Sequence, residues 1–199
     1  MPRILVNIRG TNGSGKSTIP LSMMDDPKLG VIGINNSKRP YLTLFPTYGW
    51  VALGTYFNKT GGLDTYKNNE ETRQALAWAW NYTDLDIVME GIIASTIKST
   101  YAELFKRYPT IIMSFLPPLE VCLDRVQQRN GGKPVKEDQI RSKWNTVDRN
   151  VDYFKAQGFV SLRINTAKVT KDQMLASFLK TVEKYRREVN KIGIEEGRV

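Results

Sequence analysis

A glycine-rich loop near the start of the chain constrains the fold more than any other feature. Residues 3–18 run from an apolar segment into a loop that ends in Gly-Lys-Ser-Thr. Gly10, four intervening residues, Gly15, Lys16 and Ser17 match the pattern G-x-x-x-x-G-K-[ST]. In such loops the glycines let backbone N–H groups wrap phosphates, the lysine reaches the β and γ phosphates, and the hydroxyl binds Mg²⁺. The pattern predicts a strand, a phosphate-binding loop and the first turn of a helix.

The residues on either side of this loop argue against a chance match. Residues 4–8 are mostly apolar and predict a buried strand directly before the loop. After the loop, the chain reads as the start of a helix that tolerates Pro20 in its first turn. A glycine-rich turn that only reverses the chain is the alternative, and it requires neither flank. We expect a nucleoside triphosphate to contact Thr11, Asn12, Gly13, Ser14, Gly15, Lys16, Ser17 and Thr18.

The chain has 199 residues, with no histidine and one cysteine, Cys122. This length suits a single domain, residues 1–199, with one sizeable core. The single cysteine excludes an intramolecular disulfide, and the lack of histidine argues against zinc and excludes acid–base catalysis by histidine. Any general base must therefore be a carboxylate, and a bound metal should be a hard ion such as Mg²⁺ with oxygen ligands.

Lysine and arginine outnumber aspartate and glutamate by 29 to 20, a formal net charge of +9. Such a surplus attracts polyanions, although part of it serves ATP or is solvated surface, as in residues 180–187. We expect a nucleic-acid partner, because a kinase of free nucleotides does not need so large an excess. There is no apolar run of membrane-spanning length and no signal-peptide pattern, so we expect a cytoplasmic protein. The sequence gives no indication of the oligomeric state.

Apolar runs alternate with helical patterns along the rest of the chain. Strands are expected at residues 4–8, 30–35, 86–90, 110–116 and 158–165, and helices at residues 69–80, 98–108, 119–130 and 170–189. This alternation predicts an α/β fold, with a parallel sheet of about five strands flanked by helices, as in P-loop NTPases.

Two carboxylates mark the ends of one predicted strand, Asp86 at its start and Glu90 at its end. In an open parallel sheet, ligands bind beyond the carboxyl ends of the strands. The two residues lie about 13 Å apart at ~3.3 Å per residue. Only Glu90 is therefore expected beside the phosphate loop.

Two stretches are candidates for acceptor binding and for closure of the site. Residues 36–68 form an excursion whose first part, to residue 57, carries prolines, glycines and aromatics. A β-ribbon fits this part, and its aromatics suit either a small satellite core or a surface on which bases stack. Residues 130–150 are basic and begin with Gly131 and Gly132, which favours a lid over the phosphates. An exposed helical hairpin with solvated charges is the alternative.

Taken together, these features resemble the P-loop kinases of the nucleoside and nucleotide kinase group. The resemblance rests on the phosphate loop, the strand that ends at Glu90, the lid-like stretch and the final strand before Thr166. It also rests on Arg125 and Arg129, which lie one helical turn apart. Within the group, the chain is most similar to bacteriophage kinases that phosphorylate 5-hydroxymethyluracil in DNA.

The resemblance implies a role for each matching residue. Lys16, Glu90, Arg125 and Arg129 would be catalytic, and Ser17 and Glu90 would hold Mg²⁺. Arg125 would also contact ATP, and Arg141 or Arg149 would add positive charge from the lid. The adenine would lie beside the segment Thr166, Ala167 and Lys168.

The sequence departs from better-known members of the group in two places. No Asp-Arg-Tyr or Glu-Arg-Ser follows the strand that ends at Glu90, which argues against free thymidylate or deoxynucleosides as substrates. The predicted strand 30–35 ends in Asn35 and Asn36, without a carboxylate, so Glu90 is the first candidate for the general base and Asp64 the second.

We therefore expect an ATP-dependent phosphotransferase whose acceptor is a 5-hydroxymethyl pyrimidine in DNA. If the chain is encoded by a phage, the host cytoplasm is where it would act. A kinase of free nucleosides or nucleoside monophosphates, and a non-catalytic nucleotide-binding module, are the alternatives.

Overall fold

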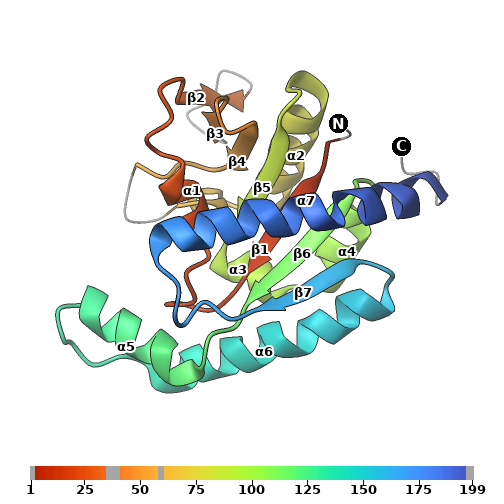
Figure 1. The fold of residues 1–199 in the computed structure, drawn as a ribbon. Helices are drawn as coiled ribbons and strands as arrows, with labels where there is room; N and C mark the ends of the chain where they lie inside the picture. Colours follow the sequence, from red (N-terminus) through yellow and green to blue (C-terminus); the bar gives the residue numbers. More distant parts are fainter. Residues whose placement is uncertain (1–2, 35–40, 58–60, 196–199) are drawn as a thin grey trace.

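The computed structural model describes residues 3–34, 41–57 and 61–195, and side chains through residue 189. The strands are β1 (Leu5–Arg9), β2 (Gly30–Gly33), β3 (Tyr41–Phe45), β4 (Trp50–Leu53), β5 (Asp86–Glu90), β6 (Thr110–Phe115) and β7 (Val160–Ile164). They form one sheet with the order β2-β3-β4-β5-β1-β6-β7 (Figure 1). β4, β5, β1, β6 and β7 are parallel, whereas β3 is antiparallel to β2 and β4.

Helices cover both faces of the sheet. They are α1 (Thr18–Ser22), α2 (Asn69–Tyr82), α3 (Ile92–Thr96), α4 (Ser99–Phe105), α5 (Leu119–Arg129), α6 (Glu137–Ala156) and α7 (Lys171–Glu195), with a 3-10 turn, η2 (Leu63–Thr65). On one face α1 and α7 pack through Ile19 and Phe178 (Figure 1). On the other, α2, α4 and α6 contribute Leu76, Phe105 and Phe154 to a second core cluster.

The predicted α/β class is confirmed, but the sheet has two strands more than the five expected from the sequence. Both come from the first part of the acceptor excursion, where β3 and β4 form a hairpin through a turn at Pro46–Gly49. The fit of a β-ribbon to this stretch was therefore correct. β4, and not the predicted strand at 30–35, lies beside β5. Asn35 and Asn36, where that strand was expected to end, lie outside the described residues.

Most aromatics of this hairpin belong to the core. Phe45, Trp50 and Tyr56 are buried, and the rings of Trp50 and Phe178 lie 5.1 Å apart. A base-stacking surface is therefore wrong for these three side chains, and their core is not a small satellite, because it continues under α7. Among the described aromatic side chains of this stretch, only that of Phe57 is exposed, at 58%.

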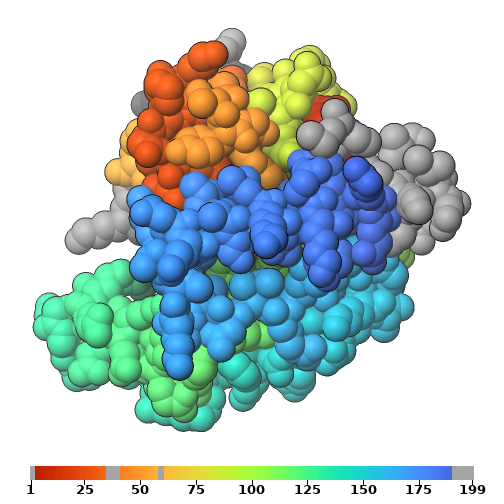
Figure 2. Space-filling model, in the orientation of Figure 1, coloured from red at the N-terminus to blue at the C-terminus, as the bar shows by residue number. Residues whose placement is uncertain are grey.

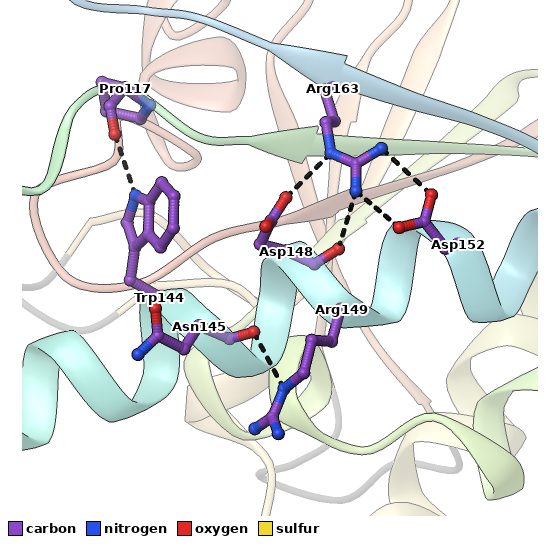
Figure 3. Close-up of polar contacts among 7 residues, drawn as sticks. All are labelled: Pro117, Trp144, Asn145, Asp148, Arg149, Asp152 and Arg163. Carbon is purple, nitrogen blue, oxygen red and sulfur yellow. Dashed lines mark hydrogen bonds and ion pairs between the residues drawn. The ribbon is translucent and has the colours of Figure 1, made fainter.

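The predicted lid at residues 130–150 is wrong for residues 137–150, because they form the first two-thirds of α6 and this helix packs on the sheet. Val147, Val151 and Phe154 recur at helical spacing and are buried. Arg163 of β7 forms ion pairs of 2.8 Å with Asp148 and 2.7 Å with Asp152 (Figure 3). These contacts join α6 to β7.

The start of α6 is also held near the sheet. The indole nitrogen of Trp144 donates a hydrogen bond of 2.9 Å to the carbonyl oxygen of Pro117, in the connection that leaves β6 (Figure 3). The part of the predicted lid that remains is the exposed connection between α5 and α6, residues 130–136. With α5 it projects from one corner of the molecule (Figure 2). Cys122, Val126 and Ile140 form a small core at its base.

Candidate active site

The predicted phosphate loop lies between β1 and α1, at the carboxyl end of the central strand. Gly13 and Gly15 have φ angles of 77° and 89°, in the left-handed region that residues with a Cβ rarely adopt. A Cβ at Gly13 would lie 2.3 Å from the carbonyl oxygen of Cys122, and one at Gly10 would lie 2.2 Å from the hydroxyl of Ser14. The spacing of the glycines thus reflects both backbone angles and close packing on α5.

The loop borders a cavity of about 250 Å³. Its walls are Asn12, Gly13, Gly15, Lys16, Ser17, Thr18, Leu21, Ile92, Arg125 and Arg129. Two predicted contact residues are not among them. The hydroxyl of Thr11 donates to the carbonyl oxygen of Ile140 in α6, and the side chain of Ser14 is fully buried. Their side chains support the loop, and only their backbone remains available for phosphate contacts.

Lys16 places a positive charge in the wall of this cavity although the residue is mostly buried. Its side chain lies in the wall, and the residue is only 7% exposed. Among the described residues it has no ion pair and no hydrogen-bond partner. Its charge interacts with that of Glu90, and a positive charge in the wall of the cavity favours an anionic ligand.

Glu90 lies opposite the loop, at the end of β5 in register with Ile8 of β1. It is 1% exposed, and it accepts a hydrogen bond of 3.1 Å from the hydroxyl of Ser17. Burial raises the pKa of Glu90 to about 7, although the charge of Lys16 opposes this rise. The prediction that Glu90 and not Asp86 reaches the loop agrees with this geometry.

Asp86, at the other end of β5, has a structural role. Its carboxylate accepts from the backbone N–H of Ile4 at 3.0 Å and forms an ion pair of 2.5 Å with Arg186 of α7. It links the start of β5 to Ile4, directly before β1, and to the C-terminal helix α7, at the opposite end of β5 from Glu90.

The residues that cover Glu90 were not predicted from the sequence. A Cβ at Gly62 would lie 2.5 Å from Oε1 of Glu90, so the chain passes directly over the carboxylate there. Tyr56 is buried nearby, and its burial, together with the charge of Glu90, raises the pKa of its phenol. Asp64, the second candidate base, accepts from the backbone N–H of Ile92 at 3.0 Å. The glycine pair before Asp64 was the one signal of this close approach.

Arg125 links the loop to the segment after β7. Its guanidinium donates to the carbonyl oxygens of Gly13 at 3.3 Å and Thr166 at 2.7 Å. Thr166 is buried, and its hydroxyl donates to the carbonyl oxygen of Ser14 at 2.7 Å. The resemblance placed these residues around ATP, and the structure brings them together at one edge of the cavity.

The remaining predicted cations are more exposed. Arg129 lines the cavity, and Lys168 is exposed beyond it. Arg141 pairs with Glu137, one turn before it on α6. Arg149 donates to the carbonyl oxygen of Asn145 on its own helix (Figure 3). Neither Arg141 nor Arg149 lines the phosphate cavity, so their predicted place in a clamp does not match this structure.

A second buried cation, Arg9, links the strand before the phosphate loop to the end of α3. It is fully buried on β1, directly before Gly10, and donates to the carbonyl oxygens of Ser95 at 2.8 Å and Ile97 at 2.7 Å. Burial lowers its pKa to about 9, so it stays protonated at neutral pH. The hydroxyl of Ser95 in turn accepts from the backbone N–H of Gly10. The end of α3 is thereby fixed to the start of the loop.

A family model described as 5-hmdU DNA kinase matches residues 4–176 of the chain. The chain belongs to the 5-hmdU DNA kinase family. The resemblance predicted from the loop, the strand that ends at Glu90 and the arginine pair is thus confirmed. The main functional reading of the sequence, a kinase acting on a 5-hydroxymethyl pyrimidine in DNA, agrees with the name that this family carries.

Curated relatives of this chain come from bacteriophages. A 5-hmdU DNA kinase of Bacillus phage SP10 is 46% identical over 169 residues, which cover 79% of this chain and 26% of that protein. This chain therefore spans about a quarter of the length of the SP10 relative. A 5-hmdU DNA kinase of Pseudomonas phage M6 is 37% identical and covers 77% of this chain and 86% of its own length.

Among solved structures, the YorR protein of Bacillus subtilis in complex with phosphorylated GDP has a similar fold. Its TM-score is 0.55 at 12% identity, and the match covers 92% of this chain and 98% of that one. This likeness shows the fold alone. Within the part of the chain that the structure describes, no helix has both the length and the apolar character that a membrane span requires.

The residues around the cavity fit a nucleotide with Mg²⁺. No group of three or more acidic, cysteine or histidine side chains that would hold a metal by itself occurs among the described residues. A hydroxyl from Ser17 and a carboxylate from Glu90 are hard oxygen donors that stand together. Magnesium is commonly held by one or two such groups together with phosphates and water. This donor set suits Mg²⁺ that arrives with a triphosphate.

Proposed function

We propose that this chain is an ATP-dependent phosphotransferase, and that it moves the γ phosphate of ATP to the hydroxyl of 5-hydroxymethyluracil in DNA. The observation that carries the proposal is that Lys16 lies in the wall of the cavity together with Ser17, which bonds to Glu90. Family membership supports the choice of acceptor. The net charge of +9 supports a polyanionic substrate.

In this mechanism the backbone N–H groups of residues 12–18 and Lys16 would bind the phosphates. Phosphoryl transfer is accelerated mainly by positioning and by neutralising charge that develops on the transferred group. Lys16 would supply one positive charge at that group and Arg129 a second. Arg125 would hold the loop and the segment at Thr166 in register for the nucleotide.

Ser17 and Glu90 would hold the metal. Mg²⁺ held there would supply positive charge that neutralises the phosphates. Glu90 is suited to this place because it accepts from Ser17 and interacts with the charge of Lys16, and because the backbone at Gly62 covers its carboxylate. For a phage protein such as these relatives, the place of action would be the host cytoplasm.

Transfer of label from ATP tests the proposal. The wild-type chain is incubated with ATP labelled at the γ phosphate and one of three acceptors: DNA with 5-hydroxymethyluracil, the same DNA with thymine, or free nucleosides and nucleoside monophosphates. We expect label in the hydroxymethylated DNA alone. Label only in the free compounds would instead assign a nucleoside or nucleotide kinase. ATP binding without label in any acceptor would assign a non-catalytic binding module.

A further inference from the structure

A second cavity lies beside the phosphate site and has no role in the functions argued above. It measures about 230 Å³, and its walls include Leu63, Asp64, Tyr66, Asn69, Thr72 and Tyr101. We propose that this cavity receives the acceptor base, turned out of the DNA helix, and that Asp64 is the general base that accepts the proton of its hydroxymethyl group. The inference rests on the proposed function and names the acceptor site within it.

The position of Asp64 between the two cavities is the first support. Both oxygens of its carboxylate accept from the backbone N–H of Ile92, at 3.0 and 3.1 Å. Ile92 lines the phosphate cavity, whereas the next residue, Ile93, lines the second one. Asp64 also lies close enough to Glu90 for its charge to raise the pKa of that residue. A base held in the second cavity would therefore contact a carboxylate that is bonded to a residue of the phosphate cavity.

The enclosure of Glu90 is the second support. Glu90 is almost fully buried, bonded to Ser17 and covered by the backbone at Gly62. Asp64 is only half-buried, and it lines a cavity. A general base must come within hydrogen-bond reach of the proton that it accepts. Of the two carboxylates, Asp64 has the open side that this requires, and Glu90 is left to the metal.

The size and chemistry of the cavity fit a single pyrimidine ring. About 230 Å³ is below the ~300–1,000 Å³ of pockets for larger ligands. Tyr66 and Tyr101 offer aromatic walls, and Leu63 an apolar one. The hydroxyl of Tyr101 donates to Oδ1 of Asn69 at 3.3 Å, which orients the amide. The carboxamide matches the carbonyl and imide N–H edge of a uracil, because it offers a donor and a second lone pair.

The chemical step balances with the groups present. The hydroxyl oxygen of the hydroxymethyl group forms a bond to the γ phosphorus while its proton passes to a carboxylate oxygen of Asp64. The bond between the γ phosphorus and the oxygen that bridges it to the β phosphate breaks. The products are a phosphomonoester on the base and ADP, and protonated Asp64 then loses its proton to water. The base reaches this position by flipping or from a single strand, as in other enzymes that modify bases.

Asp64→Asn tests the catalytic role, since an asparagine oxygen can still accept from Ile92 and only the basicity is lost. The matched control is Asp84→Asn, at an exposed position between α2 and β5. With hydroxymethylated DNA as acceptor, we expect Asp64→Asn to lower kcat by about 10²–10⁴-fold and to leave the KM for ATP unchanged. The control should behave as wild type. A wild-type kcat for Asp64→Asn would overturn the assignment of the base.

Asn69→Ala tests the cavity by a different readout, and Asn81→Ala, exposed on the same helix, is its control. We expect Asn69→Ala to raise the KM for hydroxymethylated DNA by about tenfold or more, with the KM for ATP unchanged. An unchanged KM for DNA would overturn the cavity assignment. Wild-type activity in the same assay separates the two proposals. If the wild type phosphorylates the DNA and neither variant differs from it in kcat or in the KM for DNA, only the acceptor site is wrong. If the wild type is inactive on the DNA, the proposed function and this inference are both overturned.

Discussion

The hydroxyl of Ser17 donates a 3.1 Å hydrogen bond to the carboxylate of Glu90, and this contact joins the phosphate loop to the end of β5. The two residues lie 73 positions apart in the chain. The register of the sheet helps to bring them together, because β1 and β5 are parallel neighbours and Ile8 pairs with Glu90. The fold therefore brings together the two oxygen donors that we propose for the metal.

Removal of the buried ammonium should abolish activity without loss of stability. Lys16→Met takes away the charge that faces the transferred phosphate, so we expect kcat to fall by at least ~10²-fold. Methionine has a similar length and volume in this mostly buried position, so the Tm should change little. Lys180→Met, exposed on α7, is the control and should leave both quantities unchanged. Retained activity in Lys16→Met would contradict the assigned role of the loop.

The burial of Glu90 makes the stability of the metal-free protein depend on pH. Its pKa rises from 4.5 to about 7 on folding, so the folded state binds more protons than the unfolded chain between these values. The favourable contribution is complete below pH 4.5 and is lost as the pH rises through about 7. Glu90→Gln removes this titration. In EDTA, urea denaturation at pH 4.5 and 8 should show the variant gaining up to roughly 3 kcal/mol over wild type at the higher pH. A difference that is the same at both pH values would contradict this.

The passage of the chain over Glu90 can be tested with two glycines of similar conformation. Gly62 and Gly131 have φ angles of 62° and 65°. A Cβ at Gly62 would lie 2.5 Å from Glu90, whereas nothing lies within 4 Å of one at Gly131. Gly131→Ala should cost only the ~1–2 kcal/mol of the left-handed backbone. Gly62→Ala should cost clearly more and should also lower kcat. Equal free energies of unfolding for the two variants would show that the chain at Gly62 does not press on Glu90.

Arg125 and Arg129 should differ in what they contribute. Arg125 bonds to carbonyl oxygens of Gly13 and Thr166, so Arg125→Ala should lower the free energy of unfolding by about 1–3 kcal/mol and raise the KM for ATP. Arg129 is exposed, lines the cavity and has no partner among the described residues. Arg129→Ala should therefore leave stability unchanged and lower kcat. Chemical denaturation and steady-state kinetics separate these effects, and a stability loss in Arg129→Ala would contradict the distinction.

The parts of the site that local pattern determines were predictable from the sequence. The loop from Gly10 to Thr18 follows from backbone requirements that only certain residue types meet. The placement of Glu90 follows from strand geometry, because the residue that ends a buried parallel strand reaches the ligand edge of the sheet. Both inferences need only the residues concerned and the period of a strand.

Features that depend on packing between distant segments were not predictable in this way. The charges of Arg141 and Arg149 suggested a lid, but the apolar stripe of α6 and the ion pairs of Arg163 fix that helix to the sheet. The aromatics at Phe45 and Trp50 suit a core and a stacking surface equally, and only the position of α7 decides between them. The approach of Gly62 to Glu90 likewise depends on a turn whose path no local pattern specifies.

Buried Arg9 has a consequence for how binding of the two proposed substrates responds to ionic strength. Surface charges more than about 10 Å apart are largely screened at 0.1 M salt, whereas a charge inside the protein is screened much less. Arg9 and Lys16 are both buried, so their attraction for a triphosphate should persist when salt is raised. The exposed lysines and arginines that would attract DNA under the proposed function are subject to the full counterion atmosphere. The molecule should therefore release DNA at salt concentrations at which it still retains ATP.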